Sequence, residues 1–400
     1  MKLSNIRIEK KENGARLVCD IDCSFSKSKQ MWFSVQEEYA DWLTSDVYDA
    51  FLVACLYPAM YYDEPIIVEG NVSQKIYFNI CHYIMNIVKV YREEMRSIDI
   101  KVSGFSNPEK RDHMVGTGFS AGVDSFTTFV DHFINENDSS TKISALFFFN
   151  VGSHGGGTAN ARRVFEERYD LLKQFPKDFG LPFVKMDSNL FDFYIDKWEF
   201  DAGVFCRATG ILVFQRVLSL YYLSNDYSYM ELFSGVVKMS TGCSLSALAE
   251  NIINPMLSPA GLEIITDGAQ YTRTEKTEKI ASFPFVQKYL NVCVNHWQGY
   301  ESAKNCSHCP KCLRTLTALD ALGLLDQYKN VFDLDIYKKH KKEYGYWLVS
   351  NYQNNVFAKD NVDFARLHGM QLPSNIEVKL FMFSQRLKVF LSKIKRHLFL

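Results

Sequence analysis

Short apolar segments alternate with amphipathic segments beyond residue 112, and this alternation constrains the fold more than any other feature of the chain. Apolar runs of strand length followed by segments with helical spacing indicate parallel strands with helices on both faces of the sheet. We therefore predict an α/β fold built on a doubly wound parallel sheet. The predicted strands cover residues 112–120, 142–152, 182–189 and 228–236, and the predicted helices cover residues 125–136, 158–180 and 207–224.

The composition indicates the general class of protein. The chain has 400 residues, of which 47% are hydrophobic and 23% are charged, as is typical of a globular chain with two or three domains. A formal net charge of −1 gives no general attraction to nucleic acid, which is not an expected partner. The ten cysteines are spread unevenly, the chain starts without an apolar signal core, and no apolar run approaches the roughly 20 residues of a transmembrane helix. We expect a reducing, cytoplasmic environment.

The sequence pattern predicts three regions. Residues 1–108 are predicted to form an α+β module, because a hairpin signal at Asn13-Gly14 and further strand-like runs are interspersed with helical spacing. No chemistry is evident in this module, so we interpret it as a scaffold, a substrate lid or the surface of a homodimer. Residues 109–325 contain the predicted doubly wound sheet, and residues 326–400 are predicted to be a helical extension.

The segment from Ser120 to Ser125 joins a predicted strand to a predicted helix through small residues. In doubly wound sheets, ligands bind beyond the carboxyl ends of the strands, where the amides at helix N-termini attract anions. The two serines would add hydroxyl donors, and Asp124 would hold Mg²⁺ or cap the helix. This layout is typical of a phosphate-binding loop. The alternative is a plain capping turn that binds no ligand.

A second pattern, Cys306-x2-Cys309-x2-Cys312 with Cys293 upstream, has the spacing of a metal knuckle. Four thiolates would complete a tetrahedral zinc site, and either histidine of this segment would be a substitute for one thiolate. A closed site with four protein ligands has no open position, so such a zinc ion would be structural. An iron–sulfur cluster, a redox pair and unliganded thiols are the alternatives.

The hexapeptide Ser120-Ala-Gly-Val-Asp-Ser125 resembles the Ser-Gly-Gly-x-Asp-Ser signature of the PP-loop ATP pyrophosphatases. That family binds ATP on a doubly wound sheet and splits it to AMP and pyrophosphate, in most members by adenylating a substrate oxygen. Ala121 stands in place of the first glycine of the pair, where its methyl group is tolerable at a negative φ. With the downstream cysteines included, residues 112–325 resemble 7-cyano-7-deazaguanine synthase and its relatives.

The resemblance implies roles for particular residues. Asp124, Lys276 and Arg207 are the implied catalytic residues; Lys276 lies in a basic segment like that of the family, and Arg207 matches the arginine of a Pro-x-Arg-Asn loop whose proline and asparagine are missing here. Gly152 and His154, after the second predicted strand, would contact the adenine or ribose. The implied ATP-binding residues of the loop are Ser120, Ala121, Gly122, Val123, Asp124 and Ser125.

The implied reaction uses ATP and Mg²⁺ to adenylate a small-molecule carboxylate, which ammonia or an amine then converts to an amide or nitrile. Residues 239–261 stand where the family has its Gly-Tyr-Pro-Asp-Cys substrate segment and do not contain it, so the resemblance does not identify the substrate. Two other functions are alternatives. One is an RNA-modifying sulfur transferase that uses the cysteines, and the other is a non-catalytic ATP-binding module.

The C-terminal segment is basic and amphipathic. Such a helix would dock on a membrane surface or on a protein partner. The alternative is a terminal helix that packs on its own domain. The apolar residues that share one helical stripe are Leu387, Phe390, Leu391, Ile394 and Leu398, surrounded by Arg386, Lys388, Lys393, Lys395 and Arg396.

Overall fold

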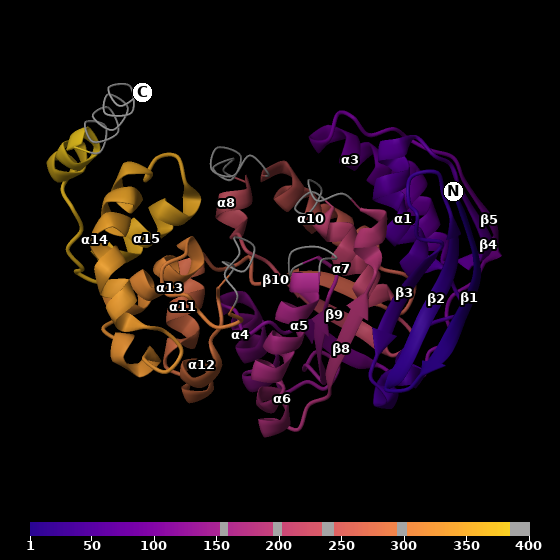
Figure 1. Cartoon of the computed structure of the whole chain (residues 1–400), viewed down its shortest axis with the longest axis horizontal. Coiled ribbons are helices and arrows are strands. Elements are labelled where there is room, and N and C mark those ends of the chain that lie inside the picture. The colour runs from indigo at the N-terminus through magenta and orange to yellow at the C-terminus, as the bar shows by residue number, and fades with distance from the viewer. Residues whose placement is uncertain (153–158, 195–201, 234–243, 294–301, 385–400) are drawn as a thin grey trace, which may run out of the picture. The chain divides into compact units, whose positions relative to one another are not determined.

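The strands that the structure describes pair into a single ten-stranded sheet (Figure 1). The computed structural model describes residues 1–152, 159–194, 202–233, 244–293 and 302–384. The strands are β1 (Lys2–Lys11), β2 (Gly14–Asp22), β3 (Gln30–Val35), β4 (Ile66–Val72), β5 (Ile100–Phe105), β6 (Met114–Gly118), β7 (Ala145–Phe149), β8 (Phe183–Ser188), β9 (Leu218–Ser224) and β10 (Glu263–Asp267). Their order across the sheet is β10-β9-β6-β7-β8-β3-β2-β1-β4-β5, and most neighbours are parallel. The predicted α/β class is confirmed.

The strands from β6 to β10 pair with one another only in parallel. Their chain order runs outwards from β6 in both directions, through β7 to β8 on one side and through β9 to β10 on the other. A reversal of this kind leaves a topological switch point between β6 and β9, at the carboxyl ends of the strands.

Helices cover both faces of these parallel strands. Side chains alternate between the two faces along a strand, so each face carries apolar side chains that pack against helices. On one face, Phe148 of β7 stacks on Phe165 of α5, with ring centroids 5.1 Å apart. On the other face, Gly210 of α7 makes room for the ring of Phe149, since a Cβ at Gly210 would lie 2.8 Å from that ring. The helical segments of this region are α4 (Val123–Phe129), its continuation η3 (Val130–Ile134), α5 (Ala159–Leu172), α6 (Gln174–Asp178), η4 (Leu190–Phe193), α7 (Gly203–Leu212) and α10 (Ser244–Met256).

The N-terminal strands extend the same sheet. β1, β2 and β3 form an antiparallel meander, and β3 pairs antiparallel with β8, so that Phe33 lies opposite Ser188. The predicted hairpin at Asn13-Gly14 is confirmed; Gly14 has a φ of 154°, and a Cβ there would lie 2.0 Å from the carbonyl oxygen of Val35. The helical segments between these strands are η1 (Glu37–Trp42), α1 (Asp49–Tyr62), α2 (Gln74–Asn79), η2 (Ile80–Ile84) and α3 (Met85–Tyr91).

The fourth predicted strand is wrong in position. Residues 218–224 form β9, although the sequence predicts a helix as far as residue 224. The predicted strand at 228–236 instead contains the short helix α8 (Tyr229–Phe233), where Ser228 and Glu231 exchange hydrogen bonds at the helix start. Periodicity cannot distinguish a short, fully buried strand from the continuation of a buried helix, which is why the prediction failed.

The chain divides into two compact units. The sheet lies in the first unit, which comprises Met1–Asp226, Cys243–Gln270 and Asn295–Ala303. The second unit comprises Tyr227–Gly242, Tyr271–Val294 and Lys304–Leu400, a division that differs from the predicted boundaries at residues 108 and 325. Its other helical segments are α11 (Arg273–Ala281), α12 (Pro284–Tyr289), α13 (Pro310–Ala321), η7 (Leu325–Tyr328), α14 (Leu334–Ser350), α15 (Val356–Leu367) and a helix over residues 375–384. Among the helices that the structure describes, none has both the length and the apolar character needed to cross a bilayer.

Candidate functional site

The predicted phosphate loop lies directly after β6, at the switch point of the parallel strands. α4 begins at Val123, with Gly122 as its N-cap. The exposed Ser120 accepts a hydrogen bond through its Oγ from the backbone N–H of Gly122, with an N···O distance of 3.4 Å. The buried Ser125 donates through its Oγ to the carbonyl oxygen of Gly122 over 3.2 Å. The loop is therefore a tight strand-to-helix turn that its two serines close.

Ala121 adopts a left-handed conformation in this turn, with a φ of 55°, and is completely buried. The negative φ at which the methyl group would be tolerated without strain is therefore not adopted. A left-handed conformation costs a non-glycine residue about 1 kcal/mol, and strain of this kind clusters at functional sites. Surrounding residues hold the turn in place: Phe119 stacks on Phe175 of α6 with ring centroids 4.5 Å apart, and Arg168 of α5 donates to the carbonyl oxygen of Ser120.

Asp124 lies half-buried in the first turn of α4, and the later turns of this helix are anchored by Asp267 at the end of β10. Asp267 accepts a hydrogen bond of 2.6 Å from Thr128 Oγ1, and its other oxygen lies 2.9 Å from His132 Nε2. Burial raises the pKa of Asp267, but the hydrogen bonds from His132 and Thr128 outweigh burial and hold that pKa below its usual value. Sequence reasoning missed Thr128 and His132, whose spacing of four residues places them on one helix face.

Polar residues also meet at the carboxyl ends of β7 and β8. Asn150 Nδ2 donates to Asp187 over 2.7 Å. Gly152 has a φ of 115°, and a Cβ there would lie 2.5 Å from the ring of Phe191, so this position requires glycine. A nucleotide contact by Gly152 stays a prediction, and His154 lies outside the described residues. Asn150 and Asp187 were missed, although each lies at the end of a predicted parallel strand.

Arg207, a predicted catalytic residue, lies on α7 and forms an ion pair with Glu250 on α10. Burial raises the pKa of Glu250, and the guanidinium group opposes that rise. Gly203, one turn earlier, lets the guanidinium group approach the helix, because a Cβ there would lie 3.0 Å from an Arg207 nitrogen. The carboxylate orients a side chain that is still 40% exposed.

Lys276, the other predicted cationic residue, lies on α11 in the second unit and is completely buried. The helix begins with a capping box in which Thr272 and Glu275 exchange hydrogen bonds. Thr274, which lies between these two residues, donates through its Oγ1 to Asp360 of α15 over 2.6 Å, which ties the two helices together. Lys276 and Asp124 therefore belong to different units.

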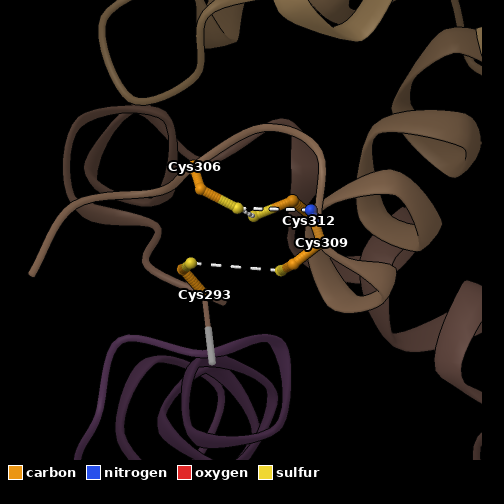
Figure 2. A group of neighbouring side chains, drawn as sticks. All are labelled: Cys293, Cys306, Cys309 and Cys312. Atoms are coloured by element: carbon orange, nitrogen blue, oxygen red, sulfur yellow. Dashed lines mark hydrogen bonds between the residues drawn. The ribbon is translucent and has the colours of Figure 1, made fainter. Parts of the chain in front are cut away.

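Four cysteines of the second unit lie together (Figure 2). The Sγ atoms of Cys293, Cys306, Cys309 and Cys312 all lie within 4.8 Å of one another, and all four residues are buried. The Sγ–Sγ distances are 3.9 Å from Cys293 to Cys309 and 4.0 Å from Cys306 to Cys312. A tetrahedral ion with metal–sulfur bonds of about 2.3 Å requires an edge of about 3.8 Å. The cluster can therefore hold a metal ion, and its donor set is compatible with zinc.

The knuckle around these cysteines is held by further hydrogen bonds. The backbone N–H of Cys309 donates to Cys306 Sγ over 3.2 Å. Asn305 accepts from the backbone N–H groups of Val292 and Cys293 and donates to two carbonyl oxygens, those of Leu290 and Val331, so it joins the two segments that carry the ligands. Such supporting hydrogen bonds orient metal ligands and are typical of metal sites.

His308 does not belong to the group of ligand atoms that lie together, and its Nδ1 lies 2.8 Å from the carbonyl oxygen of Cys306. The other histidine of the segment, His296, lies outside the described residues. Thiol contacts, above all with Cys293, lower the pKa of Cys306 to about 6. Four thiolates this close would repel one another unless a cation compensated their charge, which a metal ion at this position would do.

We found no match to the chain among protein-family models, curated proteins or solved structures. The functional interpretation therefore depends on the residues and their geometry.

Proposed function

We propose that this protein is a PP-loop ATP pyrophosphatase that adenylates a small-molecule carboxylate and passes it to ammonia or an amine. The observation that carries this proposal is the position of the segment Ser120–Ser125, which follows the central strand β6 at the switch point of a doubly wound set of parallel strands. This is the position at which nucleotides bind in such sheets, and it is also where the sequence resembles the pyrophosphatase signature.

In this proposal the amides at the start of α4 and the hydroxyl groups of Ser120 and Ser125 bind the pyrophosphate part of ATP, and Asp124 holds Mg²⁺ beside it. Bound ATP supplies an adenylyl group that turns a poor leaving oxygen into a good one. Arg207 is proposed to stabilise the negative charge that develops during the reaction. The ion pair of Arg207 with Glu250 supports its part, because a fixed guanidinium group stabilises charge without first having to be oriented.

The strained backbone at Ala121 supports an active loop. Strained residues of this kind cluster at functional sites, which is compatible with an active loop. The specificity for the carboxylate is assigned to residues 239–261. Of these, the structure describes the residues from Ser244 onwards, most of which form α10.

We further propose that the cysteine cluster holds structural zinc. Four buried thiolates around a single tetrahedral position leave no open coordination site for chemistry. In an iron–sulfur cluster the four cysteines are distributed over two or four iron atoms. Cysteine sulfurs that bind different iron atoms lie farther apart than sulfurs that bind one ion. The burial of all four thiols also counts against their use in sulfur transfer to RNA.

The test is product analysis after the protein is incubated with Mg-ATP and an extract of small molecules. The protein should release AMP and pyrophosphate in equal amounts. Asp124→Asn should lower this rate by about 100-fold or more, the effect expected when a group that stabilises transition-state charge is lost. Asp170→Asn is the matched control, because Asp170 is an exposed residue of α5 that pairs only with Lys173 among the contacts described for it.

ADP and phosphate as products would contradict the proposal, as would full activity of Asp124→Asn. A binding measurement with an ATP analogue whose α–β bridging oxygen is replaced by methylene separates the remaining outcomes. Binding without turnover in any extract would favour a non-catalytic module, and absence of binding would mean that the turn does not bind ATP.

A further inference from the structure

The C-terminal helix over residues 375–384 begins with a well-formed cap. The backbone N–H and the Oγ of Ser374 each donate to Glu377 over 2.8 Å, and the backbone N–H of Glu377 donates back to Ser374 Oγ. This reciprocal arrangement is a capping box, which fixes the start of a helix independently of the residues that follow. The helix is therefore specified locally and does not depend on burial of all its apolar residues.

This helix has apolar residues on two opposite faces. Val378 is buried, and Phe381 stacks on Tyr346 of α14 with ring centroids 4.4 Å apart and planes 11° apart. Those contacts fix the helix to the second unit. The other face exposes Ile376 (72%), Leu380 (64%) and Phe383 (68%) at intervals of four and three residues.

The helix is therefore anchored on one face and exposes three large apolar side chains on the opposite face. These side chains form a stripe along the helix axis. Spacings of four and three residues place side chains on one helix face. Isolated exposed apolar residues need no explanation, but a contiguous stripe marks an interaction surface.

The sequence beyond this helix continues the same pattern. The apolar positions Leu387, Phe390, Leu391, Ile394 and Leu398 follow the stripe at helical intervals; these residues lie outside the described part of the chain. From Val378 to the last residue the chain contains six lysine and arginine residues and no aspartate or glutamate, although the whole chain has a formal net charge of −1. Basic residues are therefore in excess in the sequence that follows Glu377, and Lys379 lies on the described helix itself.

We propose that this exposed stripe binds the surface of a membrane rich in anionic phospholipid. Exposed leucine, isoleucine and phenylalanine on one face of a helix with basic residues beside it is the pattern of interfacial helices, which combine apolar burial with attraction to anionic headgroups. A second copy of the chain fits less well, because from Ile376 onwards each copy contributes six lysine and arginine residues and only one acidic residue, Glu377. The proposal does not depend on the activity of the loop.

The test is co-sedimentation of the full chain with vesicles of phosphatidylcholine alone and with vesicles that also contain phosphatidylserine. The wild-type protein should bind the anionic vesicles, and the binding should weaken as salt increases. Ile376→Glu should reduce the bound fraction at least tenfold. Val90→Glu is the matched control, because Val90 on α3 is also 72% exposed, and it should bind as the wild type does. Lys379→Glu leaves the apolar stripe unchanged and replaces a positive charge by a negative one. It should weaken binding to the anionic vesicles and leave binding to the phosphatidylcholine vesicles unchanged.

Four outcomes would overturn the proposal. These are absence of the wild-type protein from the pellet, equal binding to both kinds of vesicle, equal losses for Ile376→Glu and Val90→Glu, and a dimer in gel filtration that Ile376→Glu dissociates. The last outcome would assign the stripe to a second copy of the chain. Circular dichroism of each variant checks that the exposed substitutions leave the fold intact.

Discussion

The loop Ser120–Ser125 and the cysteine knuckle both contain a strained backbone, which is held in place in different ways. Each contains a completely buried small residue with a left-handed backbone, Ala121 with a φ of 55° and Ser307 with a φ of 62°. Each also stands shortly before the start of a helix, α4 in the first unit and α13 in the second. Neither residue is glycine, so both backbones are strained.

The difference lies in what compensates the strain. Ser307 uses its side chain, because its Oγ accepts a hydrogen bond of 2.8 Å from the backbone N–H of Asp333. The cysteines on either side of it can in addition share a metal ion. Ala121 has only a methyl group, and its turn is held by the hydroxyl groups of Ser120 and Ser125 and by contacts with neighbouring residues. In the knuckle the side chain of the strained residue therefore offsets the strain, whereas in the loop the neighbours of the strained residue hold it in place.

Removal of the proposed metal ion should change the stability of the knuckle more than any other change proposed here. A structural zinc site contributes apparent binding free energies of about 10–16 kcal/mol, so a chelator should unfold the knuckle while the loop keeps its structure. The measurement is amide hydrogen exchange with and without chelator, which should show loss of protection in α13 and unchanged protection in β6 and α4. Zinc should be present at one equivalent before treatment. Equal protection in α13 with and without chelator would contradict a structural role for the cluster.

Loss of the Asp267 carboxylate, which holds the helix that follows the loop, should lower stability by an intermediate amount. Asp267→Asn removes the charge that holds Thr128 and His132 and should lower the free energy of unfolding of the first unit by about 1.5 kcal/mol. Because the pKa of Asp267 is lowered in the folded state, its contribution is present above the ordinary aspartate pKa of about 3.9 and is lost as the pH falls through the folded value.

Thermal unfolding between neutral pH and pH 3 measures this dependence. The Tm of the wild type should fall more steeply below about pH 4 than that of Asp267→Asn, whose Tm is lower throughout. Asp22→Asn is the control, since the Asp22 side chain is 81% exposed, and it should follow the wild-type curve. Parallel curves for the wild type and Asp267→Asn would mean that the anchor does not stabilise the folded state through its charge.

Substitution of glycine at the two strained positions should change stability least. It compares directly how the strain is compensated in the loop and in the knuckle. Ala121→Gly relieves the left-handed strain and should raise the free energy of unfolding by up to about 1 kcal/mol. Ser307→Gly relieves similar strain but loses the hydrogen bond to Asp333, worth about 1 kcal/mol, and should leave stability nearly unchanged. Denaturant unfolding compares the two. A larger gain for Ser307→Gly than for Ala121→Gly would mean that the Ser307 hydroxyl does not compensate the strain of its own turn.

Much of the candidate site could be predicted from local patterns. The cysteine spacing indicated a metal site because ligands two residues apart in a turn must converge on one point, and the four thiols do lie together. The small residues between a strand and a helix indicated the turn after β6 for a similar reason. By contrast, Asp267, which anchors α4, is 139 residues from Thr128 in the sequence, and no local pattern links the two.

The sequence by itself determined the α/β class, the hairpin at Asn13-Gly14, the loop after β6 and the four cysteines, because each depends on residues close together in the chain. Only the tertiary structure decided that β3 pairs with β8 and joins the N-terminal strands to the parallel ones, that residues 218–224 form a strand, and that Ala121 is left-handed. The physical reason is that packing between distant segments stabilises strand pairing and compensates backbone strain. The free energy of such packing is not encoded within any one segment.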